Sequence, residues 1–200
     1  MIKFYETIKI AIIGAGGFGR EVYHHMLTDG YRNIELYDDF DEAYRSSKDI
    51  DCDQYRILVS IGDPAVRRSV VESLPKNAKF FTYVSTGATI LDEDITIGEG
   101  SIICCGAILT TNITIGRHAH INLNTTIGHD CIIGDFLTTT PNVNISGNCI
   151  IGNNVYLGTN SSVRDKIHIC DDVTVGLNSG IVKNITEGGV YIGTPAKKIK

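Results

Sequence analysis

The sequence contains no tryptophan and only 4 prolines in 200 residues, and it has no stretch rich in lysine and arginine. Because the formal net charge is −5, nucleic acid and anionic membrane surfaces are poor candidates for partners. No apolar run approaches the roughly 20 residues that a membrane-spanning helix needs. The first apolar run, Ile8–Ile13, leads into glycines and not into a cleavage site, so we expect no signal peptide and a cytoplasmic protein.

The 6 cysteines show neither C-x-x-C spacing nor a zinc-ligand pattern, so we expect free thiols in a reducing compartment. Hydrophobic residues make up 42% of the chain and charged residues 20%, which is enough apolar side chain for a core and excludes wholesale disorder. Glycine is abundant, at 21 of 200 residues against an average of about 7%.

The architecture is predicted by a repeat of six residues. From Leu91 to Ile181 every sixth position is aliphatic, with Thr139 as the single exception among sixteen. A helix, at about 3.6 residues per turn, would scatter these side chains around its surface. Short strands joined by corners keep them inside, with a small residue four positions later at each corner. This is the hexapeptide signature of a β-helix, and it predicts about five triangular coils over residues 91–185, in preference to a β-sandwich.

The repeat accounts for two further features. Cys131 and Cys149 lie 18 positions apart, so we expect them as small core residues of stacked coils. Five Asn-x-Ser/Thr triplets are expected at turns and not as glycosylation sites; they begin at Asn112, Asn124, Asn144, Asn160 and Asn184.

Residues 1–84 alternate between strand and helix patterns, which is typical of a small parallel α/β sheet. The predicted strands are Lys9–Ile13, Asn33–Tyr37, Ile57–Ile61 and Lys79–Val84, and the predicted helices are Phe18–Leu27 and Pro64–Leu74. We therefore expect a half-Rossmann-like domain over residues 1–84 and a β-helix with a C-terminal cap over residues 85–200.

A glycine motif, Gly14-x-Gly16-x-x-Gly19, follows the first strand, and Asp38-Asp39 ends the second. Together they have the form of a dinucleotide fingerprint, although a merely tight strand–helix turn is the alternative. About eighty residues make only half of a doubly wound domain, so one nucleoside diphosphate fits better than NAD. Ile61–Asp63, with Arg67 and Arg68 on the following helix, is expected to close the pocket.

A small nucleotide-binding domain followed by a hexapeptide β-helix resembles the bacterial NeuD/PglD-type sugar acetyltransferases over nearly the whole chain. The segments that carry the resemblance are Gly14–Gly19, Tyr37–Asp39, Ile61–Asp63 with Arg67, Asn122 leading to Gly128–Asp130, Ile133–Phe136, Ser146–Asn148 and Gly193–Lys197. The resemblance implies a left-handed β-helix and a homotrimer with each site between adjacent subunits. It also implies acetyl transfer from acetyl-CoA to an amine, or sometimes a hydroxyl, of a sugar that is often nucleotide-linked and destined for surface glycans or lipopolysaccharide.

The chemistry needs a proton acceptor, because a sugar ammonium is not a nucleophile. We expect His129 to be the general base and Asp130, beside it at a corner, to orient the imidazole. By resemblance the backbone N–H of Gly147 stabilises the oxyanion, and the 18-residue coil places Gly147 above His129.

The remaining site residues follow from the glycine motif and the resemblance. The predicted substrate-binding residues are Gly14, Gly16, Gly17, Phe18, Gly19, Asp38, Asp39, Gly62, Asn122 and Thr138. The predicted acetyl-CoA-binding residues are Gly147, Gly158, Gly176, Leu177, Pro195 and Lys197. Thr138 stands where many relatives carry a second active-site histidine, and Phe18 where some carry a polar residue, so the acceptor sugar is left open.

Three alternatives accompany N-acetylation of a nucleotide-linked amino sugar. O-acetylation of a sugar, of the sialic-acid type, belongs to the same class. A metal-dependent hydratase on this scaffold would need His118, His120 and His129 as ligands, but their spacing is unconvincing and we expect no metal. A non-catalytic assembly role would require neither the His129–Asp130 pair nor the glycine motif.

Overall fold

The computed structural model describes residues 7–200. Its N-terminal part is a three-stranded parallel sheet in the order β2-β1-β3, formed by β1 (Lys9–Ile13), β2 (Asn33–Tyr37) and β3 (Arg56–Val59). The helices α2 (Gly17–Thr28) and α3 (Pro64–Ser73) follow β1 and β3, and the short η1 (Ser47–Asp49) lies between β2 and β3. Side chains alternate along β1, so one face packs against α2 and the other against α3.

The fourth predicted strand, Lys79–Val84, is divided between two sheets, and its assignment to the N-terminal sheet was wrong. Phe80 makes only an isolated bridge to Ile57. Tyr83–Val84 (β4) instead pairs with Ile102–Ile103 of the β-helix, where the Tyr83 N–H donates to the Ser101 carbonyl. The first part of this segment thus bonds to β3 and the last part to the β-helix. The hydrophobic pattern of a strand does not show which neighbouring strand it pairs with.

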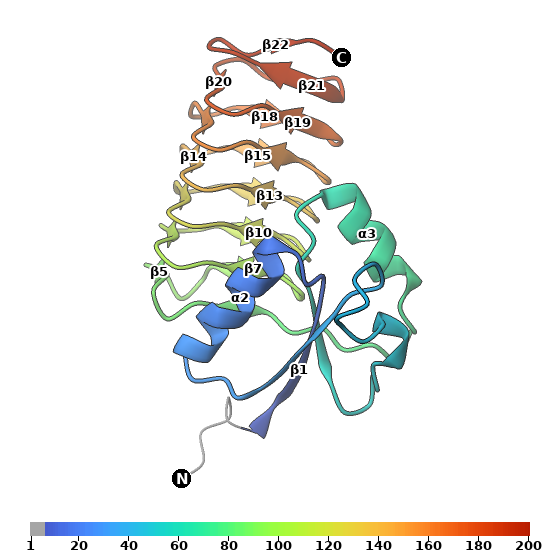
Figure 1. Cartoon of the computed structure of the whole chain (residues 1–200). Coiled ribbons are helices and arrows are strands. Elements are labelled where there is room, and N and C mark those ends of the chain that lie inside the picture. The colour runs from blue at the N-terminus through green and yellow to red at the C-terminus, as the bar shows by residue number, and fades with distance from the viewer. Residues whose placement is uncertain (1–6) are drawn as a thin grey trace.

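From Tyr83 onward the chain winds into a three-sided β-helix that rises away from the α/β domain (Figure 1). Sheet 1 contains β4, β7 (Ile102–Ile103), β10 (His120–Ile121), β13 (Thr138–Thr139), β16 (Tyr156–Leu157), β19 (Val173–Val175), β21 (Gly189–Ile192) and β22 (Lys197–Lys198). Sheet 2 contains β5 (Thr89–Ile90), β8 (Ile108–Leu109), β11 (Thr126–Ile127), β14 (Asn144–Ile145), β17 (Ser162–Val163) and β20 (Gly180–Ile181). Sheet 3 contains β6 (Thr96–Ile97), β9 (Thr114–Ile115), β12 (Ile132–Ile133), β15 (Ile150–Ile151) and β18 (His168–Ile169).

From β6 to β20 the register confirms the repeat: residues paired across neighbouring coils differ by 18, as His120 and Thr138 do. The first strands differ by 19, since Tyr83 pairs with Ile102 and Ile90 with Leu109, so the first coil holds one extra residue before β6. The predicted fold class, an α/β domain followed by a left-handed β-helix, is confirmed. The number of coils is six and not five, because winding already starts at Tyr83. Leu91, expected to point inward, is 62% exposed, because Ile90 and not Leu91 pairs with the buried Leu109 of the next coil.

The corners explain the asparagines. Every sixth residue from position 112 to 178 has a positive φ between 51° and 61°, a region that asparagine tolerates better than most residues. Asn112, Asn124 and Asn160 occupy such corners, as expected for turn residues, whereas Asn144 and Asn184 do not. Thr139, the polar member of the aliphatic ladder, is satisfied inside the core because its hydroxyl accepts from the Asn122 N–H at 3.0 Å.

Candidate active site

The turn between β1 and α2 depends on two glycines. Gly14 has φ +99°, and a Cβ at Gly19 would overlap the Gly14 carbonyl, so only glycine allows the helix to pack on the turn. Gly16 is the N-cap of α2, and no side chain bonds to the first amides of the helix. These N–H groups and the helix dipole make the start of α2 suitable for an anion such as a phosphate.

A cavity of about 390 Å³, here called the loop cavity, opens beside this turn. The predicted residues that line it are Gly14, Gly16, Gly17, Phe18, Asp38, Asp39 and Gly62. Ile13, Phe40, Ser60, Ile61, Val66 and Val70 also line it and were not predicted as site residues. Gly19 is buried behind the turn, outside this lining.

The two aspartates at the end of β2 are held by their own chain. Asp38 accepts from the Ala15 N–H at 2.8 Å and from the Phe40 N–H at 2.9 Å, so it ties the loop after β2 to the glycine turn. Asp39 accepts from the hydroxyls of Ser46 and Ser47, and these bonds lower the pKa of its carboxyl.

A second cavity of about 300 Å³, the seam cavity, lies where the α/β domain meets sheet 1. It shares Gly17, Phe18 and Gly62 with the loop cavity, and the β-helix contributes the predicted residues Asn122 and Thr138. Its other lining residues are Glu21, His120, Thr140, Pro141 and Tyr156, none of which was predicted as a site residue. The structure thus brings the glycine turn and the predicted β-helix residues to one continuous lining.

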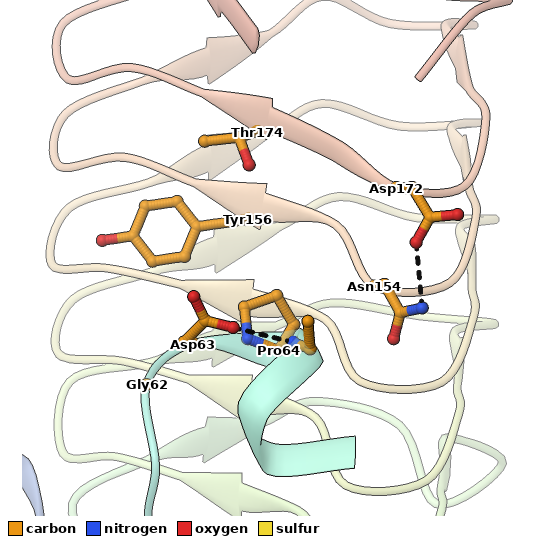
Figure 2. Close-up of a pocket in the computed structure, with 8 residues that line it drawn as sticks. Gly62, Asp63, Pro64, Asn154, Tyr156, Asp172 and Thr174 are labelled. Atoms are coloured by element: carbon orange, nitrogen blue, oxygen red, sulfur yellow. Dashed lines mark hydrogen bonds between the residues drawn. The ribbon is translucent and has the colours of Figure 1, made fainter. Parts of the chain in front are cut away.

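A third cavity of about 560 Å³, the outer cavity, lies between the start of α3 and the coils above (Figure 2). Asp63 and Pro64 approach it from the α/β domain, and Tyr156 and Thr174 face it from sheet 1. It shares Gly62 and Tyr156 with the seam cavity, so all three cavities meet around Gly62.

Arg67 does not close the nucleotide pocket, contrary to expectation, but is fully buried between the two domains. Its guanidinium donates to the carbonyls of His118, Ile61, Gly62, Phe136 and Leu137 and to the Thr138 hydroxyl, and it contacts Nδ1 of His120. Burial lowers the pKa of Arg67 to about 9. Arg68, on the exposed side of α3, pairs instead with Glu72 at 2.8 Å.

Thr138 shares this anchoring role. Its hydroxyl donates to the Gly62 carbonyl at 2.8 Å and accepts from Arg67 at 2.9 Å. The side chain is buried, and its hydrogen bonds fix Gly62 at the junction of the three cavities.

His118 and His120 are also interface residues. His120 is buried, with Nε2 at 2.9 Å from the Val59 carbonyl and Nδ1 at 3.2 Å from Arg67, and burial lowers its pKa well below the ordinary value. The His118 ring stacks on Phe136 with ring centroids 5.2 Å apart and meets Phe80 edge-on. Within residues 7–200 no group of three or more metal-type ligands comes together.

The burial of His118 predicts acid sensitivity. Burial, with the charges of Arg117 and Arg67, lowers its pKa to about 4 in the folded chain, against about 6.5 when unfolded. Between these values the unfolded chain binds a proton that the folded chain does not, so the free energy of unfolding falls as the pH drops through this window. Between pH 7 and pH 5 the free energy of unfolding, measured with urea, should fall by about 2 kcal/mol less in His118→Phe than in the wild type.

Phenylalanine is a suitable replacement because Phe136 occupies the same corner position one coil above, with φ 61°. His120 titrates in the same direction in both proteins, so the comparison isolates His118. An equal loss in the variant would show that His118 does not contribute to acid sensitivity.

The predicted catalytic pair lies at another corner, between sheets 2 and 3. His129 Nδ1 is 2.6 Å from Asp130 Oδ2, and Asp130 Oδ1 accepts from the Asn112 amide at 2.6 Å. The bond from Asn112 and the bond from His129 lower the pKa of Asp130. The imidazole lies directly under Gly147, where a Cβ would be 2.7 Å from Nε2. A glycine is therefore required above His129 for the ring to keep this place.

His129 is 58% exposed and lines none of the three cavities described above. Apart from Gly147, the predicted acetyl-CoA residues lie in the last coils. Gly158 and Gly176 are stacked one coil apart, and Leu177 is 69% exposed. Pro195 follows a cis peptide bond, and Lys197 begins β22.

The N-terminal region matches a known protein family. Residues 9–74 match the family described as the PglD N-terminal domain. This match extends over the α/β domain from β1 to α3. The whole chain is similar to the acetyltransferase domain of PglB from Neisseria gonorrhoeae FA1090, solved with acetyl coenzyme A. That match has 27% identity, a TM-score of 0.87 and coverage of 96% of this chain and 98% of that one.

Two further PglD-type structures extend the similarity. WeeI from Acinetobacter baumannii AYE is 29% identical, with a TM-score of 0.84 and coverage of 96% and 100% of the two chains. PerB from Caulobacter crescentus, solved with CoA and GDP-perosamine, has a TM-score of 0.86 over 96% and 97%, and at 21% identity this likeness concerns the fold. The predicted resemblance to NeuD/PglD-type acetyltransferases, and with it the acyltransferase class, is confirmed.

The comparison with curated protein sequences found no significant match. Within residues 7–200 the two helices are too short or too polar to cross a membrane.

Proposed function

We propose that this PglD-type protein transfers the acetyl group of acetyl-CoA to the amine of a nucleotide-linked amino sugar used in surface glycan synthesis. The observation that carries the proposal is the end-to-end similarity to the PglB acetyltransferase domain solved with acetyl coenzyme A. The loop cavity, at the start of α2, supports a nucleoside diphosphate as the handle of the acceptor. The adjoining seam cavity is then the place for the sugar.

In the proposed mechanism the proton of the attacking amine passes to His129. Asp130 accepts the Nδ1–H of the imidazole, which leaves the lone pair on Nε2 for the proton and stabilises the imidazolium that forms. The Gly147 N–H donates to no acceptor within residues 7–200 and is therefore free for the oxyanion of the thioester. Collapse of the intermediate then breaks the C–S bond, the His129 imidazolium returns its proton to the departing CoA thiolate, and the acetamide remains.

One protomer does not bring these parts together. The loop cavity lies in the α/β domain, and the seam and outer cavities lie against sheet 1. His129 lies at the corner between sheets 2 and 3 and lines none of the three. A site made from the cavities of one chain and His129 of a neighbour resolves this separation. We therefore propose a homotrimer with sites between subunits, and acetyl-CoA bound along the last coils.

The direct test is a panel of UDP-, GDP- and dTDP-linked amino sugars with acetyl-CoA, followed by release of the free thiol. Acetylation of at least one of them is expected. Thiol release with none of these sugars, combined with acetylation of a sugar hydroxyl, would replace N-acetylation by O-acetylation.

The glycine turn can be tested with Gly16→Val. A Cβ at Gly16 meets nothing within 4 Å, and its φ is −63°, so the fold tolerates the change. The branched side chain should obstruct the phosphates and raise KM for the nucleotide sugar about tenfold. The KM for acetyl-CoA should stay within about twofold, and a loss of acetyl-CoA binding would place the donor at the turn instead. Gly14→Val is unsuitable for this test because Gly14 has φ +99°.

The shared site predicts complementation between two defective chains. In a mixed trimer, a His129→Ala chain supplies an intact loop cavity and a Gly16→Val chain supplies an intact His129. Co-expressed chains carrying different tags should recover roughly a quarter of the wild-type rate in an equal mixture, measured at nucleotide-sugar concentrations well below the wild-type KM. Mixed trimers that are folded but show no recovery would place His129 and the cavities of a site in one chain.

A further inference from the structure

Phe40 is 99% exposed, which makes it the most exposed large hydrophobic side chain in residues 7–200. A single exposed apolar residue is ordinary on a protein surface. Phe40, however, lines the loop cavity. Its backbone is fixed there, because its N–H donates to Asp38, which also accepts from Ala15 in the glycine turn.

The opposite wall of the loop cavity is also apolar. Val66, which is 48% exposed, and Val70 line the cavity from α3, while Ile13 and Ile61 line it from the carboxyl ends of β1 and β3. The polar side chains of the lining already have partners in the protein. Asp38 and Asp39 accept the bonds described above, and the Ser60 hydroxyl donates to the Gly14 carbonyl at 2.8 Å. The cavity mouth is therefore an apolar slot with an aromatic ring on one side.

We infer that Phe40 stacks on the nucleobase of the acceptor substrate, with Val66 on the other side of the slot. This inference rests on the proposed function, which puts a nucleoside diphosphate in the loop cavity. With the phosphates at the start of α2, a base carried one ribose further lies at the cavity mouth. Stacking on an aromatic ring recognises any base because every base has a π face. Phe40 thus supplies affinity for the nucleotide and little discrimination between bases.

Kinetics of Phe40→Ala test the inference. Loss of a stacking ring should raise KM for the nucleotide sugar about tenfold and leave kcat and the KM for acetyl-CoA unchanged. Phe40→Tyr keeps the ring and should behave like the wild type. Leu91→Ala removes another exposed hydrophobic side chain, 62% exposed and outside the cavity, and should change neither constant. Unchanged KM in Phe40→Ala, with active enzyme, would overturn the inference.

Because the sequence contains no tryptophan, Phe40→Trp introduces a single fluorescent reporter. Titration with UDP or GDP should quench its emission, whereas inorganic pyrophosphate should not. Absence of quenching by both nucleotides, or equal quenching by pyrophosphate, would show that no base stacks on this residue. The reporter also separates the two proposals: quenching by nucleotides without acetylation of any nucleotide sugar supports the stacking role and refutes the proposed function.

Discussion

Replacement of His129 by alanine is expected to lower kcat by about 10²–10⁴-fold, which is the usual contribution of a general base. The imidazole is held between Asp130 and Gly147, and alanine leaves no proton acceptor in its place. The KM for acetyl-CoA should change little, because the other predicted donor contacts lie in the last coils and Gly147 contributes only its backbone N–H. The measurement is thiol release at saturating concentrations of both substrates.

His168→Ala is the matched control, since His168 is an exposed histidine on sheet 3 of the same β-helix. It should leave kcat unchanged. Asp130→Asn should cost less than His129→Ala, because it disturbs the orientation of the ring and keeps the proton acceptor. Asparagine also suits the positive φ of 59° at this corner. Wild-type turnover in His129→Ala would remove this residue from the mechanism.

Replacement of Arg67 by methionine is expected to destabilise the protein by about 3 kcal/mol or more. The change keeps much of the side-chain volume but leaves buried carbonyls at Ile61, His118 and Phe136 without their donor. The Leu137 carbonyl keeps the His120 N–H as a donor. A buried acceptor without a partner costs about 1–3 kcal/mol. Relief of the burial penalty that lowers the pKa of Arg67 offsets part of this loss.

Urea unfolding measures the effect, and Arg68→Met is the control on the same helix. Arg68 lies on the surface in an exposed pair with Glu72, so its loss should change the free energy of unfolding by less than about 0.5 kcal/mol. If Arg67→Met and Arg68→Met had equal effects, the buried guanidinium would not hold the two domains together.

The six-residue period predicted the β-helix and its 18-residue register, because a single geometric rule relates each position to the next coil. The same rule placed Gly147 above His129. It did not predict where winding begins. Tyr83 joins the β-helix through a backbone hydrogen bond to the Ser101 carbonyl, and a backbone bond of this kind cannot be inferred from the side chains in the sequence.

The parts of the site that depend on contacts between domains were less predictable. An arginine close to a glycine loop favours contact with a ligand, so Arg67 was predicted to close the pocket. Its partners are instead mainly backbone carbonyls more than 50 positions away in the sequence. Phe40 follows two aspartates that match the motif, and only its exposure at the cavity mouth distinguishes it. The separation of His129 from the cavities likewise depends on which side of the prism each corner occupies.

Because the coil length is constant, the height of any coil depends only on how many coils lie below it. Arg67 and Thr138 hydrogen-bond the α/β domain to the coils at His118 and Phe136–Thr138, which fixes the position of the domain along the β-helix axis. Each further coil moves the C-terminal segment by one unit of about 4.8 Å. Gain or loss of a whole coil above Tyr156 would therefore shift the C-terminal cap without disturbing the junction at Gly62. A protein built this way can change the number of its coils during evolution while the α/β domain and its junction with the β-helix stay the same.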